Sequence, residues 1–273
     1  MKELILELKK ELVSPVEMDP VLPEKIESMK IDEIKDIKLY CGKKIVKLED
    51  IFDIELNEID SEPRIIIKNS TMKLKYIGAK MTKGEIVVEG DAGIGVGAEM
   101  KGGKIIVEGN ADSWAGMNLK GGELIIKGNA KNYLGSSYRG DWRGMSGGKI
   151  IVEGNIGSEA GEFMNGGEIH IKGNAGMYLG IHQNGGIIFV NGNVGPRLGG
   201  EMKAGAIVVY GEVEDLLPSF KYEGIVENPV IKLKKKDPGV KVEGKFYKLT
   251  GDFVNEKPKG QLYISVDKNP NLF

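Results

Sequence analysis

Short hydrophobic runs recur along this chain at a nearly fixed interval. Runs such as Ile105–Val107 and Ile150–Val152 each follow a glycine and lead to another glycine. The glycine before each run gives the series Gly84, Gly103, Gly122, Gly148, Gly167, Gly186 and Gly205, with five intervals of 19 residues and one of 26. A repeat of about 20 residues predicts a solenoid, in which each repeat covers the apolar face of the next.

Alternation within each run assigns its side chains to two sides of a strand. The residues two and four positions after the glycine are aliphatic in every repeat: Ile86, Ile105, Leu124, Ile150, Ile169, Ile188 and Ile207, then Val88, Val107, Ile126, Val152, Ile171, Val190 and Val209. The runs are too short for helices, and a 19-residue coil at ~3.3 Å per residue has a perimeter of roughly 60 Å, enough for three short strands. We therefore predict an all-β fold, a right-handed parallel β-helix of about seven coils with both columns inside.

The residues between these columns face outward. One outward column alternates in sign through Glu85, Lys104, Glu123, Lys149 and Glu168, so neighbouring coils attract in the correct register by about 0.2–1 kcal/mol per pair. The next column is mostly apolar and comprises Val87, Ile106, Ile125, Ile151, His170, Phe189 and Val208. An apolar outer stripe predicts a cover, either the chain's own ends or a partner protein. The sequence leaves both alternatives open.

The segments outside the repeats are predicted to cap the solenoid. Residues 1–64 read as a small N-terminal α/β cap with a strand at Leu4–Leu8 and a short helix next to Pro23. Residues 65–217 form the glycine-repeat β-helix, with an atypical first coil, as expected at an open end. Residues 218–273 form a C-terminal extension with a basic run at 232–236. We expect that run to be solvated, with an acidic partner surface as the alternative.

One break in the period marks a candidate interface. Seven extra residues between Gly135 and Met145 create a loop at 136–144 that reads SSYRGDWRG. Insertions in solenoids often form the binding face, and Tyr, Trp and Arg are enriched at interface hot spots. Either arginine can pair with a partner's carboxylate, whereas Asp141 offers an internal partner that would only staple the loop. We favour contact with another protein chain through Tyr138, Arg139, Asp141, Trp142 and Arg143.

Composition narrows the function further. The chain has 38 basic and 40 acidic residues and a net charge of −2, so we expect neither a nucleic-acid nor a membrane partner. It has no apolar run of membrane-spanning length and no signal-peptide pattern, so we expect a cytoplasmic protein. Cys41 is the single cysteine, and His170 and His182 are not in a ligand spacing. We expect no catalytic, cofactor-binding or metal site in this chain.

The repeats carry a resemblance to known proteins. Copies of Gly-Gly-x-Ile-x-Val-x-Gly-Asn, each followed by a glycine of the series 97, 116, 135, 161, 180 and 199, resemble the glycine-repeat β-helix at the C-terminus of the glutamate synthase large subunit. The loop at 138–148 (YRGDWRGMSGG) and the segment Lys47–Phe52 are more similar to the family of formylmethanofuran dehydrogenase C subunits. This closer resemblance covers about residues 1–217.

The resemblance implies a non-catalytic scaffold subunit of an archaeal complex. That complex reduces CO2 and fixes it as N-formylmethanofuran, the first step of methanogenesis. The implied partners are a tungsten- or molybdenum-pterin catalytic subunit, an amidohydrolase-type subunit with a dinuclear metal centre, and iron–sulfur subunits. Self-association into a homo-oligomer also remains open.

Three other functions are alternatives. A formyltransferase/hydrolase complex uses a similar subunit, and a stand-alone relative of the glutamate synthase β-helix would have a structural role in glutamate metabolism. A polysaccharide-cleaving β-helix enzyme is disfavoured because the outward acids alternate with lysines instead of forming a carboxylate pair.

Overall fold

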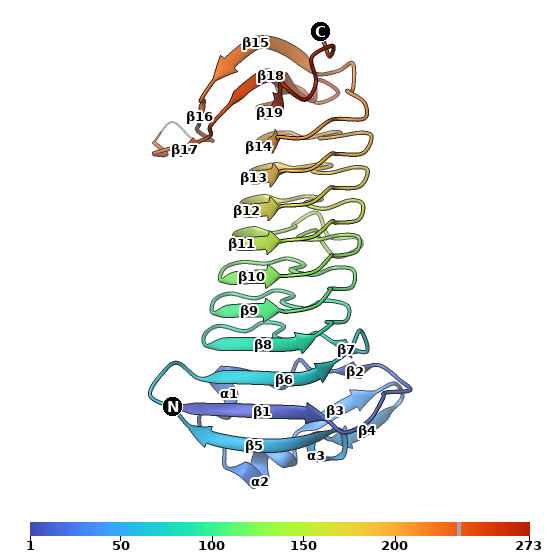
Figure 1. Cartoon of the computed structure of the whole chain (residues 1–273), viewed down its shortest axis with the longest axis vertical. Coiled ribbons are helices and arrows are strands. Elements are labelled where there is room, and N and C mark those ends of the chain that lie inside the picture. Colours follow the sequence, from blue (N-terminus) through green and yellow to red (C-terminus); the bar gives the residue numbers. More distant parts are fainter. Residues whose placement is uncertain (234–235) are drawn as a thin grey trace.

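The computed structural model of this 273-residue chain describes residues 1–233 and 236–273, so Lys234 and Lys235 of the predicted basic run lie outside the described residues. Helices in the described part are few and short: α1 Pro23–Ile26, α2 Ile31–Lys35 and α3 Leu48–Ile51. Strands account for most of the regular structure (Figure 1). The predicted all-β class is therefore confirmed.

Each glycine-marked repeat contributes one strand to a stack along the long axis of the molecule (Figure 1). These strands are β8 Glu85–Gly90, β9 Lys104–Val107, β10 Glu123–Ile126, β11 Ser146–Val152, β12 Asn165–Ile171, β13 Asn184–Val190 and β14 Ala204–Val209. Neighbours pair in parallel, and equivalent repeat positions face each other, as in Ile105↔Leu124 and Leu124↔Ile150. All residues of the two predicted aliphatic columns are buried.

The flanking segments extend this sheet at both ends. Before the repeats, β6 Arg64–Ser70 and β1 Lys2–Leu8 continue the parallel stack, and β5 Phe52–Glu58 pairs with β1 in antiparallel. After them, β19 Gly260–Ser265 pairs in parallel with β14, followed by antiparallel β18 Lys245–Gly251 and β15 Lys221–Glu227. Antiparallel strands thus close the stack at each end and cover edges that would otherwise be unpaired.

Two smaller sheets complete the described chain. The N-terminal one contains β2 Val16–Glu17, β3 Lys38–Cys41, β4 Lys44–Lys47 and β7 Leu74–Lys75. The other pairs β16 Val230–Ile231 with β17 Val240–Lys241 in the C-terminal extension. The N-terminal sheet joins β2 to β7 in parallel and so attaches the N-terminal segment to the chain just before the first marked repeat.

The corner that follows each repeat strand is held by a ladder of side chains. The Asn129 backbone N–H donates to Oδ1 of Asn110 at 2.9 Å, and the Asn155 N–H donates to Oδ1 of Asn129 at 2.8 Å. Asn174 and Asn193 continue the same pattern. The preceding glycine is needed for close approach, because a Cβ at Gly128 would lie 2.7 Å from the Gly109 carbonyl oxygen.

The outward charge column forms ion pairs between successive repeats. Lys104 Nζ lies 3.7 Å from Glu123 Oε2, and Lys149 Nζ lies 3.9 Å from Glu168 Oε2. These side chains are solvated, so each pair stabilises the fold by less than about 1 kcal/mol. Their main effect is on register, since a slip of one coil brings like charges together.

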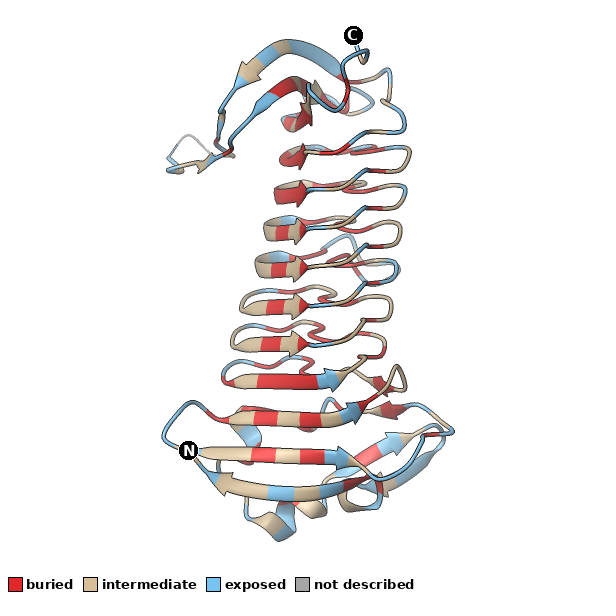
Figure 2. Cartoon of the chain, in the orientation of Figure 1, coloured by how far each residue is buried: buried red, intermediate tan, exposed pale blue. Residues whose placement is uncertain are grey.

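The outer apolar stripe is covered at its C-terminal end by the chain itself. Phe189 and Val208 are buried against Ile231, Phe246 and Tyr263 of the C-terminal extension. The middle of the stripe, at Ile106, Ile125, Ile151 and His170, stays half-buried, as the alternating colours of β9–β12 show in Figure 2. The chain's own C-terminal extension, the first of the two predicted covers, therefore covers the C-terminal end of the stripe.

Candidate interface around the inserted loop

A column of aromatic side chains lines one corner of the coils. Tyr76, Trp114, Tyr133 and Tyr178 occupy equivalent repeat positions, each with a left-handed φ between 56° and 64°. The rings of Trp114 and Tyr133 stack with centroids 4.6 Å apart and an interplanar angle of 9°. Sequence reasoning missed this column, although an aromatic residue two positions before a glycine at 116, 135 and 180 was the available signal.

The inserted loop is anchored at both ends beside this column. Ser136 and Ser137 are buried, and the Ser136 hydroxyl donates to the Tyr133 carbonyl oxygen at 2.8 Å. At the far end, the Gly144 N–H donates to the Phe163 carbonyl oxygen at 3.0 Å. Between the anchors, Tyr138 is 59% exposed and Trp142 is 66% exposed. The fold thus presents two large aromatic side chains to solvent on a loop that is anchored at both ends.

The two arginines of the loop have different environments. Arg143 Nε lies 3.0 Å from Asp141 Oδ1, and the Arg143 guanidinium lies 5.5 Å from the centre of the Trp142 ring. The hydrogen bond from Arg143 lowers the pKa of Asp141 below its ordinary value, so this carboxylate stays ionised further into the acidic range. Asp141 is therefore the internal partner of Arg143, one of the two alternatives weighed from the sequence.

Arg139 is the loop cation that remains available. Its guanidinium lies 5.7 Å from the centre of the Trp114 ring, and it has no ion-pair partner among the described residues. A guanidinium over an indole keeps its hydrogen-bond donors free at the edge. Of the five predicted residues, Tyr138 and Trp142 are exposed, Arg139 lies beside the Trp114 ring, and Asp141 is paired with Arg143.

The two histidines are engaged separately. The His170 ring, on β12, stacks on Phe189 with centroids 4.6 Å apart, and its Nε2 lies 2.8 Å from Glu168. The His182 ring, at a corner, stacks on Phe163 with centroids 4.6 Å apart, and its Nδ1 lies 3.5 Å from Glu201. Over the described residues, no group of three or more His, Cys, Asp or Glu side chains is arranged to hold a metal ion. The absence of a metal site stays a prediction.

No helix in the described ranges combines the length and apolar character needed to cross a membrane. The few helices that are present belong to the N-terminal 64 residues.

Known proteins resemble this chain over most of its length. It is 69% identical over 272 residues to the C subunit of tungsten-containing formylmethanofuran dehydrogenase 2 from Methanococcus maripaludis strain S2, covering 100% of both chains. It is 78% identical over 236 residues to the protein of the same name in Methanocaldococcus jannaschii, covering 86% of both chains. No protein-family model matches the chain.

A solved structure shares the fold. It is the crystal structure of the formyltransferase/hydrolase complex from Methylorubrum extorquens with methylofuran, one chain of which superposes with a TM-score of 0.83 at 24% identity. The match covers 96% of this chain and 99% of the other. At 24% identity this similarity shows only a shared fold, whereas the relatives at 69% and 78% identity show the family. The chain belongs to the family of C subunits of the tungsten-containing formylmethanofuran dehydrogenases.

Proposed function

We propose that this chain is the scaffold subunit of a formylmethanofuran dehydrogenase complex. That complex is an oxidoreductase that reduces CO2 and fixes it as N-formylmethanofuran, the first step of methanogenesis. The observation that carries the proposal is 69% identity over the full length of a relative named as the C subunit of this enzyme. Both of the relatives described above are named as tungsten-containing, which favours the tungsten form over the molybdenum form.

A rigid rod suits this role, and we propose that residues 65–217 form a right-handed parallel β-helix of about seven coils. Parallel pairing of equivalent positions in β8–β14 supports this. Residues 1–64 are its cap and residues 218–273 its C-terminal extension. One continuous hydrophobic cluster includes Leu4, Ile150 and Ile264, which supports one rigid body with its parts fixed relative to one another.

The loop at 136–144 is the proposed contact with other subunits. Its exposed Tyr138 and Trp142 sit on a loop whose two ends are hydrogen-bonded to neighbouring repeats, which limits the conformational entropy lost on binding. Arg139 supplies a cation for a partner's carboxylate, and the Asp141–Arg143 pair fixes the loop's shape. The partners are the pterin-binding, amidohydrolase-type and iron–sulfur subunits, which hold the metal and pterin cofactors of the complex.

The fold match favours one second candidate, a subunit of a formyltransferase/hydrolase complex. We prefer the dehydrogenase because the named sequence relatives are 69% and 78% identical, against 24% for the structural match. The two candidates can be told apart by metal content: the dehydrogenase complex contains tungsten or molybdenum, and the formyltransferase/hydrolase complex contains neither.

The purified isolated chain tests the scaffold role. We expect no stoichiometric tungsten, molybdenum, zinc or iron, no bound flavin or pterin, and no formylmethanofuran dehydrogenase activity. The chemical reason is the ligand inventory, a single cysteine and two histidines that contact neighbouring side chains. Elemental analysis by mass spectrometry and the absorption spectrum check this. One equivalent of any of these metals in the single chain would contradict a purely scaffolding role.

A further inference from the structure

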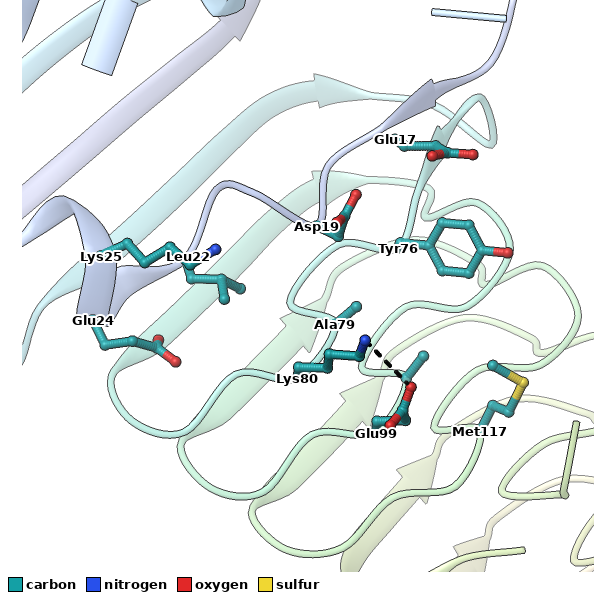
Figure 3. Close-up of a pocket in the computed structure, with 11 residues that line it drawn as sticks. Glu17, Asp19, Leu22, Glu24, Lys25, Tyr76, Ala79, Lys80, Glu99 and Met117 are labelled. Carbon is teal, nitrogen blue, oxygen red and sulfur yellow. Dashed lines mark ion pairs between the residues drawn. The ribbon is translucent and has the colours of Figure 1, made fainter. Parts of the chain in front are cut away.

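A cavity of about 520 Å³ lies between the N-terminal cap and the first coils. One wall comes from the cap segment that carries Glu17, Asp19 and Glu24, and the other from the corners that carry Tyr76 and Glu99 (Figure 3). We call it the cap cavity. Segments far apart in the sequence form this cavity, so no local sequence motif predicts it.

The cap cavity has an apolar lining with one aromatic face. Leu22, Ala79, Ala98 and Met117 contribute aliphatic surface. The Tyr76 ring packs against the backbone of Gly95 in the next repeat. The contact is so close that a Cβ added at Gly95 would lie 2.6 Å from a ring carbon. Such a lining suits the methylene stem of a long side chain, and a tyrosine face attracts a cation.

Two carboxylates at the cap cavity are uncompensated. Figure 3 shows Glu17 and Asp19 on the cap segment near Tyr76, and among the described residues neither carboxylate has a hydrogen-bond or ion-pair partner. Burial raises the pKa of Tyr76, and the charges of Glu17 and Asp19 raise it further. The two carboxylates, which have no cationic partner in the part of the chain that the structure describes, make the local potential beside Tyr76 negative.

The other charged groups leave that potential negative. Glu24 Oε1 accepts hydrogen bonds from the Thr82 N–H at 2.8 Å and the Thr82 hydroxyl at 2.9 Å, while its Oε2 is buried without a partner among the described residues. Glu99 is paired with Lys80 at 3.8 Å and with Lys120 at 3.4 Å. Four carboxylates therefore line the cavity, against the ammonium groups of Lys25 and Lys80 in its lining and that of Lys120 beside Glu99, which leaves one negative charge in excess.

From these observations we infer that the cap cavity receives a lysine or arginine side chain from another subunit of the complex. Its stem lies along the apolar wall, and its cationic head lies between Tyr76 and the carboxylates of Glu17 and Asp19. The inference rests on the proposed scaffold function. It extends the proposed interface, because Glu99 lines both the cap cavity and the hollow beside Asp141 and Arg143.

The test compares two charge-matched double variants in the purified, reconstituted complex. Glu17→Gln with Asp19→Asn removes the uncompensated carboxylates, and Glu89→Gln with Glu108→Gln removes two exposed carboxylates near the ends of β8 and β9. Because losing one side of a desolvated charge pair is costly, we expect the first variant to assemble at least tenfold more weakly and with less dependence on salt. The control should assemble normally, and both isolated chains should keep the wild-type melting temperature.

The outcomes separate this inference from the proposed function. If the cavity variant assembles normally while loop variants do not, the inference is wrong and the scaffold function stands. If the unmodified chain recruits no other subunit, the function itself is wrong. Binding of n-butylguanidinium to the isolated chain at millimolar concentration, together with normal assembly of the cavity variant, would identify a small-molecule site and overturn the proposed contact between subunits.

Discussion

Ile150→Asp is expected to abolish soluble, folded protein. Ile150 is fully buried, and strand register places Leu124 on one side of it and Ile169 on the other. An unpaired carboxylate there costs several kcal/mol, because the neighbouring repeats place only aliphatic side chains beside it and offer no partner for the charge. That penalty is comparable with the 5–15 kcal/mol total stability typical of a folded protein. Soluble yield and thermal unfolding followed by circular dichroism measure the effect.

The adjacent residue gives a matched control. Ile151 lies on the same strand but faces outward and is only half-buried. Ile151→Asp introduces the same charge one residue away, and we expect it to remain soluble with a small loss of stability. Native-like melting of Ile150→Asp, or collapse of both variants alike, would show that the inward and outward columns are wrongly assigned.

Trp142→Ala combined with Arg143→Ala is expected to disrupt assembly while leaving the fold intact. Trp142 is 66% exposed and the loop lies outside the buried columns, so little folding energy is lost. At an interface, aromatic and arginine hot spots contribute up to several kcal/mol in total, with strong non-additivity. Melting temperature of the chain and recovery of the complex are measured on the same preparations. Tyr40→Ala, at a 58% exposed position in the cap, is the control for losing an exposed aromatic ring.

The two readouts discriminate the two roles of the loop. Unchanged melting with lost recovery supports the interface. A lower melting temperature of the chain with normal recovery of the complex would show that the Asp141–Arg143 pair only stabilises the loop internally. If both quantities match the wild type, the loop has neither role and the interface assignment is wrong. Arg139→Ala, which leaves the Asp141–Arg143 pair in place, tests separately whether the unpaired cation contributes.

The stacked core was predictable because its signal is local and repeated. Seven marker glycines and two aliphatic columns specify which residues face inward, and the register of β8–β14 follows from the same spacing. The ends were harder to predict. The pairing of Ile207 with Leu262 joins residues 55 positions apart. The repeat pattern does not extend to β19, so it could not predict that β19 continues the stack.

The candidate site was predictable only where it broke the period. The loop and its five residues could be identified from the 26-residue interval, and Asp141 between two arginines indicated the staple. The aromatic column was missed because large aromatic residues seldom adopt a positive φ, whereas Trp114 and Tyr133 do so here. The placement of Arg139 over Trp114 depends on how the loop folds back and has no sequence signature.

Mass spectrometry of the proteins that co-purify with an affinity-tagged copy of this chain, from the cells that naturally produce it, tests the scaffold function most directly. The result we predict is a stable assembly with the pterin-binding, amidohydrolase-type and iron–sulfur subunits of formylmethanofuran dehydrogenase, with tungsten in the assembly and none in the separated chain. Recovery of the chain alone, or with a glutaminase or flavin subunit in place of these partners, would contradict it.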